Sequence, residues 1–365
     1  MAATEAQWDL MVVGASFAGV ACALAARHSG LRVCVLERKR DPGIKLHTTG
    51  IIVREAAEGT ALARLPQTLV QRIEGVRLYA PNLRHMSLHS PGYYFLATDT
   101  PGVMRWLAGE AEAAGVELRL MQSFTDAHRI DGGWRVDGLG RCRWLVGADG
   151  AKSRVAMRAG LGRVREFLYG VEHEFDGLAL DEPDRLHCFI DRTLAPGYIG
   201  WAVQNPRGVQ LGLAFRHRPD RTGVPDIERF RQRVGALLGL PATAEATATR
   251  AGLIPCGGPV RPLAAANVIL TGDAAGIVSP VTAGGIHSAW RHGEAVGAAI
   301  ARQLRDGGPD PALEAERAAP RFRGKRLLRW AFDRLQADWP FDLLIGTPPL
   351  RELAARVFFS SRSGG

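Results

Sequence analysis

The chain contains few cysteines, and their spacing is uninformative for metal or disulfide chemistry. Five cysteines occur in 365 residues, an odd number, and no two of them form a CxxC pair: Cys22, Cys34, Cys142, Cys188 and Cys256. This scatter argues against a disulfide framework and against a zinc site, so we predict no metal. Such cysteine usage is typical of a protein in a reducing environment, which predicts a cytoplasmic location.

Long hydrophobic runs and nucleic-acid modules are also absent from the sequence. No uncharged apolar stretch reaches the roughly 20 residues of a transmembrane helix, and the first residues do not have the pattern of a signal peptide. The net charge of +9 is spread along the chain, without zinc-finger spacing or a basic–aromatic stripe. We therefore predict no nucleic-acid partner. The basic surface still suits phosphate-bearing ligands or an anionic membrane.

A glycine-rich turn near the N-terminus is the first motif with a chemical meaning. Residues 10–13 are apolar, the sequence GASFAG (14–19) follows, and an alanine-rich helical pattern leads to a second apolar run ending at Glu37. Strand, glycine turn, helix and strand, closed by an acid, are typical of dinucleotide binding. The helix N-terminus would face the diphosphate, and Glu37 would accept hydrogen bonds from a ribose. Ser16 replaces the middle glycine of the fingerprint, and it is still small.

Two later segments repeat the pattern of a strand that runs into glycine and aspartate. The sequence WLVGADGAKSRV (144–155) contains Asp149, and NVILTGDAAG (267–276) contains Gly272 and Asp273. Three such strand ends predict a single extended ligand, with Asp273 accepting a hydroxyl of a ribityl chain. This pattern favours FAD over NAD. A helix beginning near Gly284 would direct its N-terminus at the flavin.

Taken together, these motifs resemble the flavoproteins of the aromatic-hydroxylase fold, and within that superfamily the geranylgeranyl reductase branch. The resemblance covers roughly residues 8–305. The stretch GIVSPVTAGGI (276–286) is closer to the reductase pattern than to that of the hydroxylases. The resemblance implies that FAD is bound by Gly14, Ser16, Phe17, Ala18, Gly19, Glu37, Arg38, Lys45, Asp149, Gly272, Asp273, Pro280, Gly284, Gly285 and Ile286.

The loop at residues 41–53 departs from the family pattern. Reductases of this branch usually show GxKxCGGG there, with the cysteine facing the flavin, whereas this chain reads GIKLHTTG (43–50). His47 takes the place of the cysteine, and Thr48 and Thr49 replace two glycines. Two interpretations stay open: His47 is a catalytic proton donor, or it is a loop histidine that hydrogen-bonds backbone or phosphate.

A segment of the presumed substrate region carries a partial family motif. The sequence APGYIGWAVQNP (195–206) resembles the Pro-Gly-Tyr-x-Trp-x-Phe-Pro segment of the reductases, although two residues rather than one separate Tyr198 from Trp201. We predict that Tyr198 and Trp201 contact the substrate; the alternative is that they only pack within a strand.

The resemblance also implies a fold, which is α/β with a Rossmann-like FAD-binding domain, an antiparallel substrate domain and a C-terminal helical segment. We place the discontinuous FAD-binding domain at residues 1–75, 96–170 and 252–305, and the substrate domain at 76–95 and 171–251. A hairpin at 76–90, strands near 186–190, 200–204 and 209–215, and an amphipathic helix at 226–240 fill the substrate domain. The helix should dock through Ile227, Phe230, Val234, Leu237 and Leu238.

The C-terminal segment, residues 306–365, contains a basic amphipathic stretch. Arg321, Arg323, Lys325, Arg326 and Arg329 alternate with leucine, tryptophan and phenylalanine. It could rest on an anionic membrane as a peripheral contact, or it could pack across the FAD-binding domain with its arginines in solvent.

The motifs predict an FAD-dependent oxidoreductase that acts on a carbon–carbon bond of an apolar, isoprenoid or lipid-like substrate by hydride exchange with flavin N5. Electrons would come from NAD(P)H or a reduced carrier, since no second nicotinamide fingerprint occurs. One alternative is an FAD-dependent monooxygenase that hydroxylates or epoxidises its substrate, and another is a non-catalytic flavin-binding protein. The sequence does not define the substrate or the oligomeric state.

Overall fold

The computed structural model describes residues 7–218, 223–334 and 338–359, and its architecture is α/β, as predicted. A central sheet is built around the parallel strands β1 (Gln7–Val13), β2 (Val33–Leu36) and β11 (Gly140–Gly147). All four residues of β2 are buried, because helices cover the sheet and leave no wet face. The other strands are β8 (Glu117–Arg119), β9 (Ala127–Ile130), β10 (Gly133–Val136), β17 (Ala264–Ala265) and β18 (Val268–Leu270).

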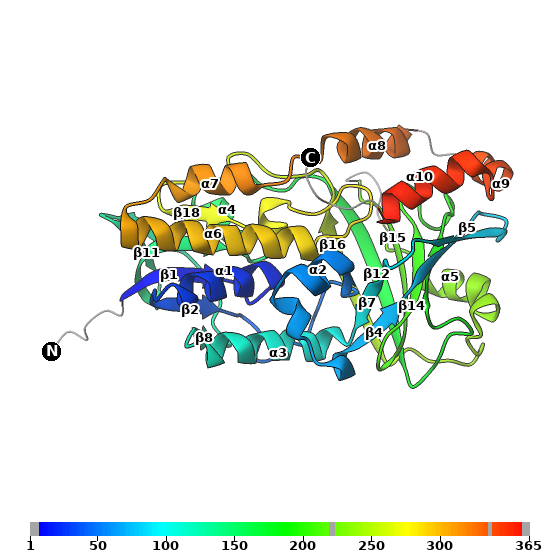
Figure 1. Cartoon of the computed structure of the whole chain (residues 1–365), viewed down its shortest axis with the longest axis horizontal. Helices are drawn as coiled ribbons and strands as arrows, with labels where there is room; N and C mark the ends of the chain where they lie inside the picture. Colours follow the sequence, from blue (N-terminus) through cyan, green and yellow to red (C-terminus); the bar gives the residue numbers. More distant parts are fainter. Residues whose placement is uncertain (1–6, 219–222, 335–337, 360–365) are drawn as a thin grey trace.

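Helices α1 (Phe17–His28) and α6 (Ile286–Asp306) run side by side on this sheet (Figure 1). The hydroxyl of Ser16 caps α1 by accepting a hydrogen bond of 3.2 Å from the amide of Gly19. Gly307, with φ of +66°, ends α6 in the left-handed conformation that glycine favours. The remaining helices of this part are α3 (Thr100–Ala113), α4 (Arg154–Arg158) and α7 (Pro311–Ala318).

A second sheet of seven strands has the order β16-β12-β15-β14-β13-β5-β6, and it is antiparallel except for the parallel pair β13 and β5. The expected hairpin at 76–90 is confirmed, and the three expected strands are present. The bounds are β5 (Gly75–Tyr79), β6 (His85–His89), β12 (Phe167–Asp176), β13 (Arg185–Phe189), β14 (Gly200–Gln204), β15 (Gly208–Arg216) and β16 (Ala248–Pro255).

Helix α5 (Ile227–Val234) packs against the second sheet and is shorter than predicted. Ile227, Phe230 and Val234 are buried, as is Leu238 in the 3₁₀ turn that follows. The expectation that Leu237 docks with them is wrong. The α-helix ends at Val234, so the helical spacing no longer applies, and Leu237 is 42% exposed.

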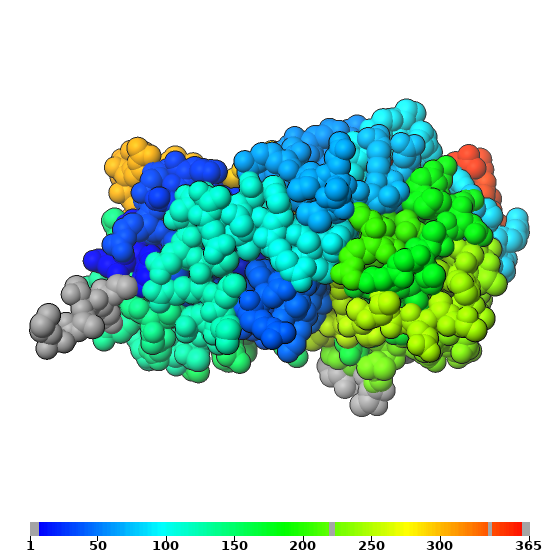
Figure 2. Space-filling view, turned by 90° about the horizontal axis from the view of Figure 1, so that it is seen from below, coloured from blue at the N-terminus to red at the C-terminus, as the bar shows by residue number. Residues whose placement is uncertain are grey.

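A small sheet that the sequence did not predict lies between the two large ones. It consists of β3 (Ile51–Val53), β4 (Val70–Ile73) and β7 (Phe95–Thr98), and the short helix α2 (Arg54–Gly59) follows β3. Figure 2 shows an elongated molecule, with the green and yellow segments of the second sheet gathered at one end.

The C-terminal helices α8 (Arg323–Arg334), α9 (Trp339–Leu344) and α10 (Pro348–Phe359) lie along one side of the molecule, over the second sheet (Figure 1). Backbone amides of Arg192 and Asn82 donate to the carboxylates of Asp338 and Asp342, at 3.0 and 2.9 Å. The expectation that the arginines of this segment all face solvent is wrong for Arg329, which is 3% exposed. Its guanidinium is buried because Asp333 and the carbonyl of Gly197 accept its hydrogen bonds.

Among the helices in the described part of the chain, none combines the length and the hydrophobicity that a membrane crossing requires.

Candidate active site

A cavity of about 500 Å³ lies where the motif loops meet the second sheet and the C-terminal helices. Its wall is formed by the N-terminus of α1, the loop at 47–51, strands β12, β14 and β16, and the inner side of α8 to α10. The predicted site residues that line it are Ser16, Phe17, Ala18, His47, Tyr198, Trp201, Gly272, Asp273, Gly284, Gly285 and Ile286. Segments far apart in the sequence therefore meet at one space, as the motifs predicted for a single ligand.

The turn between β1 and α1 has a shape that only glycine permits. Gly14 has φ of +105°, and a β-carbon there would lie 2.4 Å from the carbonyl oxygen of Ala148. A β-carbon on Gly19 would lie 2.0 Å from the carbonyl oxygen of Gly14. The close approach brings the N-terminus of α1 against the strand, with no acidic side chain in its first turn. The exposed amides and the helix dipole of such a terminus suit a diphosphate.

Glu37 lies at the end of β2, where the fingerprint requires an acid. Its carboxylate is buried and accepts hydrogen bonds from the backbone amides of Ala15 and Lys39, at 3.2 and 3.0 Å. These bonds fix the acid beside the glycine turn. Arg38 and Lys45 are exposed and do not line the cavity.

Asp149 follows β11, and its carboxylate caps the short helix α4. It accepts hydrogen bonds from the hydroxyl of Ser153 at 2.6 Å and from the amides of Arg154 and Val155 at 2.7 and 3.2 Å. The side chain is therefore used locally, and it does not line the cavity, although its neighbours Ala148 and Gly150 do. Burial raises the pKa of Asp149, and these hydrogen bonds oppose the shift.

Asp273 lies in the 3₁₀ turn Gly272–Ala275 and opens into the cavity. Its side chain is accessible from the cavity, yet it is surrounded by protein, and this desolvation raises its pKa to about 6. No hydrogen bond to its carboxylate comes from residues 7–218, 223–334 or 338–359. A cavity-facing carboxylate that lacks a protein donor fits a ligand rich in hydroxyl groups, such as the ribityl chain of FAD.

The segment before α6 completes this side of the cavity. Gly284, Gly285 and Ile286 line it at the N-terminus of α6, a helix of 21 residues. Its first turn contains no acid, so its dipole favours negative charge on a bound ring. Pro280 is buried beside this segment but does not reach the cavity.

His47 also lines the cavity, and its ring is anchored to the second sheet. Nδ1 lies 2.8 Å from the carbonyl oxygen of Ala251 in β16. Because a carbonyl only accepts, Nδ1 carries a proton in this contact, and Nε2 of a neutral ring is then an acceptor. Proton donation by His47 into the cavity would therefore require the doubly protonated ring.

Tyr198 and Trp201, which the partial motif predicts to contact the substrate, both line the cavity. Burial raises the pKa of the Tyr198 phenol well above its usual value, so it remains neutral. The indole of Trp201 packs so closely over Gly212 that a β-carbon there would lie 2.0 Å from a ring carbon. Trp201 Nε1 donates a hydrogen bond of 3.1 Å to Glu172, which orients the ring.

Sequence reasoning missed the polar residues of this wall and the cover formed by the C-terminal helices. Glu172 on β12, Arg250 on β16 and Thr49 all line the cavity. Apolar residues of the last helices close it: Phe332, Phe341, Leu350, Leu353, Ala354, Val357 and Phe358. The available signal was the sequence VEHEF at 171–175, which places two acids on one face of a strand between apolar residues.

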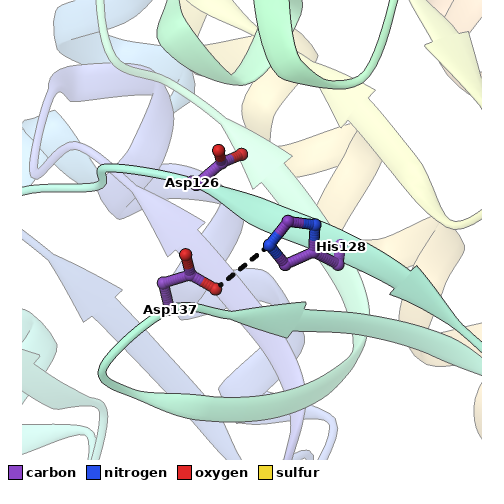
Figure 3. A group of neighbouring side chains, drawn as sticks. All are labelled: Asp126, His128 and Asp137. Atoms are coloured by element: carbon purple, nitrogen blue, oxygen red, sulfur yellow. Dashed lines mark ion pairs between the residues drawn. The ribbon is translucent and has the colours of Figure 1, made fainter.

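A separate surface group of acids and histidine lies at the edge of the first sheet, away from the cavity lining. Asp126 precedes β9, His128 is on it, and Asp137 follows β10; His128 Nε2 lies 3.5 Å from Asp137 (Figure 3). Arg158 Nη1 lies 3.4 Å from Asp126 and competes with any cation for that carboxylate. We assign no function to this group.

The fold and the cavity define a flavoprotein. Residues 7–331 match the FAD binding domain family, and the chain belongs to it. It is an FAD-dependent oxidoreductase, as the motifs predicted, and its relatives confirm the predicted similarity to the geranylgeranyl reductase-like branch.

Two relatives and one solved structure illustrate this placement. Digeranylgeranylglycerophospholipid reductase 2 from Methanopyrus kandleri is 27% identical over 318 residues, which span 82% of this chain and 78% of the relative. The protein of the same name from Methanothermobacter thermautotrophicus is 25% identical over 338 residues, or 89% and 83% of the two chains. A geranylgeranyl bacteriochlorophyll reductase-like protein from Thermoplasma acidophilum has a TM-score of 0.82 at 18% identity, with 93% and 90% of the chains covered. At that identity the structural similarity shows the fold.

Proposed function

We propose that this oxidoreductase reduces carbon–carbon double bonds in an isoprenoid, lipid-like substrate. The observation that carries the proposal is the cavity, which joins the FAD motifs to a wall of apolar side chains from the C-terminal helices. An isoprenoid chain presents no hydrogen-bonding groups along its length, and an apolar wall of this kind binds it by excluding water. The names of the two relatives, both reductases of digeranylgeranyl lipids, support the same substrate class.

Within this proposal, FAD lies along the segments that the sequence singled out. The turn Gly14–Gly19, with Ser16, Phe17 and Ala18, holds the diphosphate at the start of α1, and Glu37 binds the ribose next to Arg38. Gly272 and Asp273 hold the ribityl chain, and Gly284, Gly285 and Ile286 face the ring. Lys45, Asp149 and Pro280 support these loops without lining the cavity.

Bound FAD in its reduced form supplies the hydride for one carbon of the double bond. We infer that NAD(P)H or a reduced carrier protein restores it from outside, because the sequence contains a single dinucleotide fingerprint. The protein excludes water from the cavity and positions the isoprenoid chain of the substrate. It must also deliver a proton to the second carbon.

The test combines a spectrum with a substrate panel. Purified protein should show bound FAD, and under anaerobic conditions chemically reduced enzyme should add hydrogen to geranylgeranyl lipids, with each product gaining two hydrogen atoms per double bond. Reoxidation of the flavin by these lipids without oxygen supports the proposal. A product that carries an oxygen atom and forms only in air would overturn it in favour of monooxygenase chemistry.

We further propose that the outer side of the C-terminal helices rests on an anionic lipid bilayer. Leu327 and Trp330 of α8 are 69% and 52% exposed, and Trp339 and Leu343 of α9 are 69% and 67% exposed. Exposed arginines accompany them: Arg323, Arg326 and Arg334. Exposed apolar and aromatic side chains together with basic ones match the interface of a bilayer that carries negative charge. The inner side of the same helices lines the cavity, which places the bilayer beside the substrate pocket.

Vesicle sedimentation tests this contact. The protein should bind vesicles containing phosphatidylglycerol more strongly than neutral phosphatidylcholine vesicles, and a Leu327→Ser, Trp330→Ser variant should lose most of that binding. The matched control is Leu313→Ser on α7, because Leu313 is 53% exposed but lies outside α8 to α10. Equal binding by the double variant and the parent protein would rule out this surface.

A further inference from the structure

Glu172 is a buried carboxyl group in the wall of the cavity. Its side chain is 5% exposed. Oε2 accepts hydrogen bonds from the hydroxyl of Thr49 at 2.5 Å and from the indole of Trp201 at 3.1 Å. Oε1 has no hydrogen-bond partner among the residues that the structure describes, although it lies 3.7 Å from Arg250 Nη1. Such a half-satisfied buried carboxyl is costly in its ionised form.

Burial, together with the sharing of one arginine between two carboxyl groups, favours a proton on Glu172. Arg250 on β16 makes its close ion pair with Glu174, two residues further along β12, and it also donates to the carbonyl of Thr48 at 2.9 Å. Two buried carboxyl groups thus share one guanidinium, so the cluster is neutral only when one of them is protonated. Burial raises the pKa of Glu172; the Thr49 hydrogen bond and the charge of Arg250 oppose this shift, and Glu174 reinforces it.

Thr49 connects this carboxyl group to the cavity. It lines the cavity, and its backbone carbonyl is held by the hydroxyl of Thr100 at 2.9 Å and by the side-chain amide of Gln210 at 3.1 Å. When Glu172 is ionised, Thr49 donates to it. When Glu172 is protonated, the same short contact allows the carboxyl to donate, which frees the threonine hydrogen for the cavity.

We propose that Glu172 and Thr49 form a proton relay that supplies the proton for double-bond reduction. This inference rests on the proposed function. As the π bond breaks, one carbon takes the hydride and its neighbour takes the proton of the Thr49 hydroxyl. Glu172 replaces that proton on the Thr49 oxygen and becomes a carboxylate opposite Arg250. Water reprotonates it between turnovers, so two C–H bonds form and the protein returns to its starting state.

The position of His47 makes it the competing donor. Because Nδ1 is committed to the carbonyl of Ala251, Nε2 can donate into the cavity only when both ring nitrogens carry a proton. Glu172, in contrast, can donate a proton in its neutral form, and its burial favours that form. The relay therefore assigns His47 a positioning role beside β16 and gives the proton to Glu172.

The first experiment locates the proton on the cofactor-free protein, without any turnover. A carboxyl group with a raised pKa in the folded state binds more protons there than in the unfolded chain, so its contribution to stability falls as pH rises from its usual value through the raised one. Glu172→Gln should remove this component of the Tm–pH curve. Infrared spectra should show a protonated carboxyl band that is lost in Glu172→Gln and kept in Glu55→Gln, the control.

Glu55 is a suitable control because it too has one bonded and one unbonded carboxylate oxygen, and it does not line the cavity. Glu174→Gln tests the sharing of Arg250. Removing Glu174 leaves the whole guanidinium charge to Glu172, so its pKa should fall and the protonated band should disappear at a lower pH. An unshifted band in Glu174→Gln, or a band untouched by Glu172→Gln, overturns the relay.

The second experiment follows single-turnover oxidation of the reduced enzyme by a geranylgeranyl lipid. Thr49→Val and Glu172→Gln should each slow it by about 100-fold with FAD affinity unchanged, and Thr49→Ser should restore the rate. His47→Ala should keep the pH profile of the parent protein. If His47→Ala abolishes the pH dependence of the rate while Thr49→Val leaves it intact, His47 is the proton donor and the relay is wrong. If no lipid is reduced by the parent enzyme, the proposed function fails, and the infrared result still decides where the proton lies.

Discussion

Gly293 of α6 packs directly against the backbone carbonyl of Ala18 in α1. A β-carbon at Gly293 would lie 2.2 Å from that oxygen, and one at Gly297 would lie 2.2 Å from the carbonyl of Cys22. Two glycines spaced four residues apart thus let the two helices touch backbone to backbone. This contact fixes the start of α1, which carries the glycine turn, relative to the start of α6, which lines the cavity.

We therefore expect Gly293→Ala to destabilise the protein by about 1–3 kcal/mol, because the helices must move apart to admit the methyl group. FAD affinity should fall as well, since the diphosphate turn moves with α1. Differential scanning calorimetry and FAD titration measure the two effects. Gly109→Ala in α3 is the control: nothing lies within 4 Å of the added carbon, so there the substitution should stabilise by about 0.5–1 kcal/mol. Equal effects of both substitutions would show that the helix contact is unimportant.

Asp273→Asn should weaken FAD binding by about 10- to 100-fold, which corresponds to one lost charge-assisted hydrogen bond of about 1.5–3 kcal/mol. The carboxylate faces the cavity, so the amide keeps its shape and loses only the charge. Fluorescence titration of the cofactor-free protein with FAD gives the affinity. Asp310→Asn, at the N-cap of α7, alters a carboxylate of another helix and should leave FAD affinity unchanged. An unaltered affinity in Asp273→Asn would remove this residue from the cofactor site.

His292 makes the protein sensitive to acid. The ring is buried between the hydroxyl of Thr271 and the carbonyl of Ala315, and burial lowers its pKa to about 4. Between about pH 6.5 and pH 4 the ring is therefore protonated in the unfolded chain but not in the folded protein. The free energy of unfolding consequently falls as the pH drops through this range. The loss approaches about 3 kcal/mol at the acid end. Urea denaturation at pH 7 and pH 4.5 measures it. His292→Gln cannot titrate, so its stability should change less between the two pH values; an equal change would contradict the assignment.

The motifs predicted the first sheet and its loops because their residues are fixed by local backbone demands. Gly14 has a positive φ and lies too close to Ala148 for a side chain, so the position requires glycine. A glycine between a strand pattern and a helix pattern therefore predicts this turn directly. The polar wall could not be found in this way. Thr49, Glu172 and Arg250 are separated by 123 and 78 residues. The pairing of β12 with β16 brings Arg250 to Glu172, and the loop before β3 brings Thr49 to the same carboxyl group. Register between distant strands is set by the whole core rather than by the neighbouring sequence.

The C-terminal helices are a second case in which the sequence predicted the elements but not their contacts. Their composition predicted an amphipathic helical segment, and the structure has helices there, with Leu327 and Trp330 exposed. What the composition did not reveal is that the other side would close the cavity, or that Arg329 would be buried. A buried arginine depends on acceptors supplied by the fold, here Asp333 one turn away and the carbonyl of Gly197 in the loop between β13 and β14.

Arg329 should therefore hold α8 over the cavity. Arg329→Leu keeps much of the side-chain volume but leaves the carbonyl of Gly197 without its donor, while Asp333 retains Arg216 at 3.4 Å. A buried acceptor that loses its partner costs about 1–3 kcal/mol, so opening of α8 should become roughly 10- to 100-fold more frequent. Hydrogen exchange of the amides in α8 measures this opening. Arg326→Leu on the exposed side of the same helix is the matched control. Asp333 still joins α8 to Arg216 of β15 in both variants, so the comparison isolates the contact between Arg329 and Gly197. Faster exchange in both variants would mean that helix propensity, rather than this contact, keeps the cover in place.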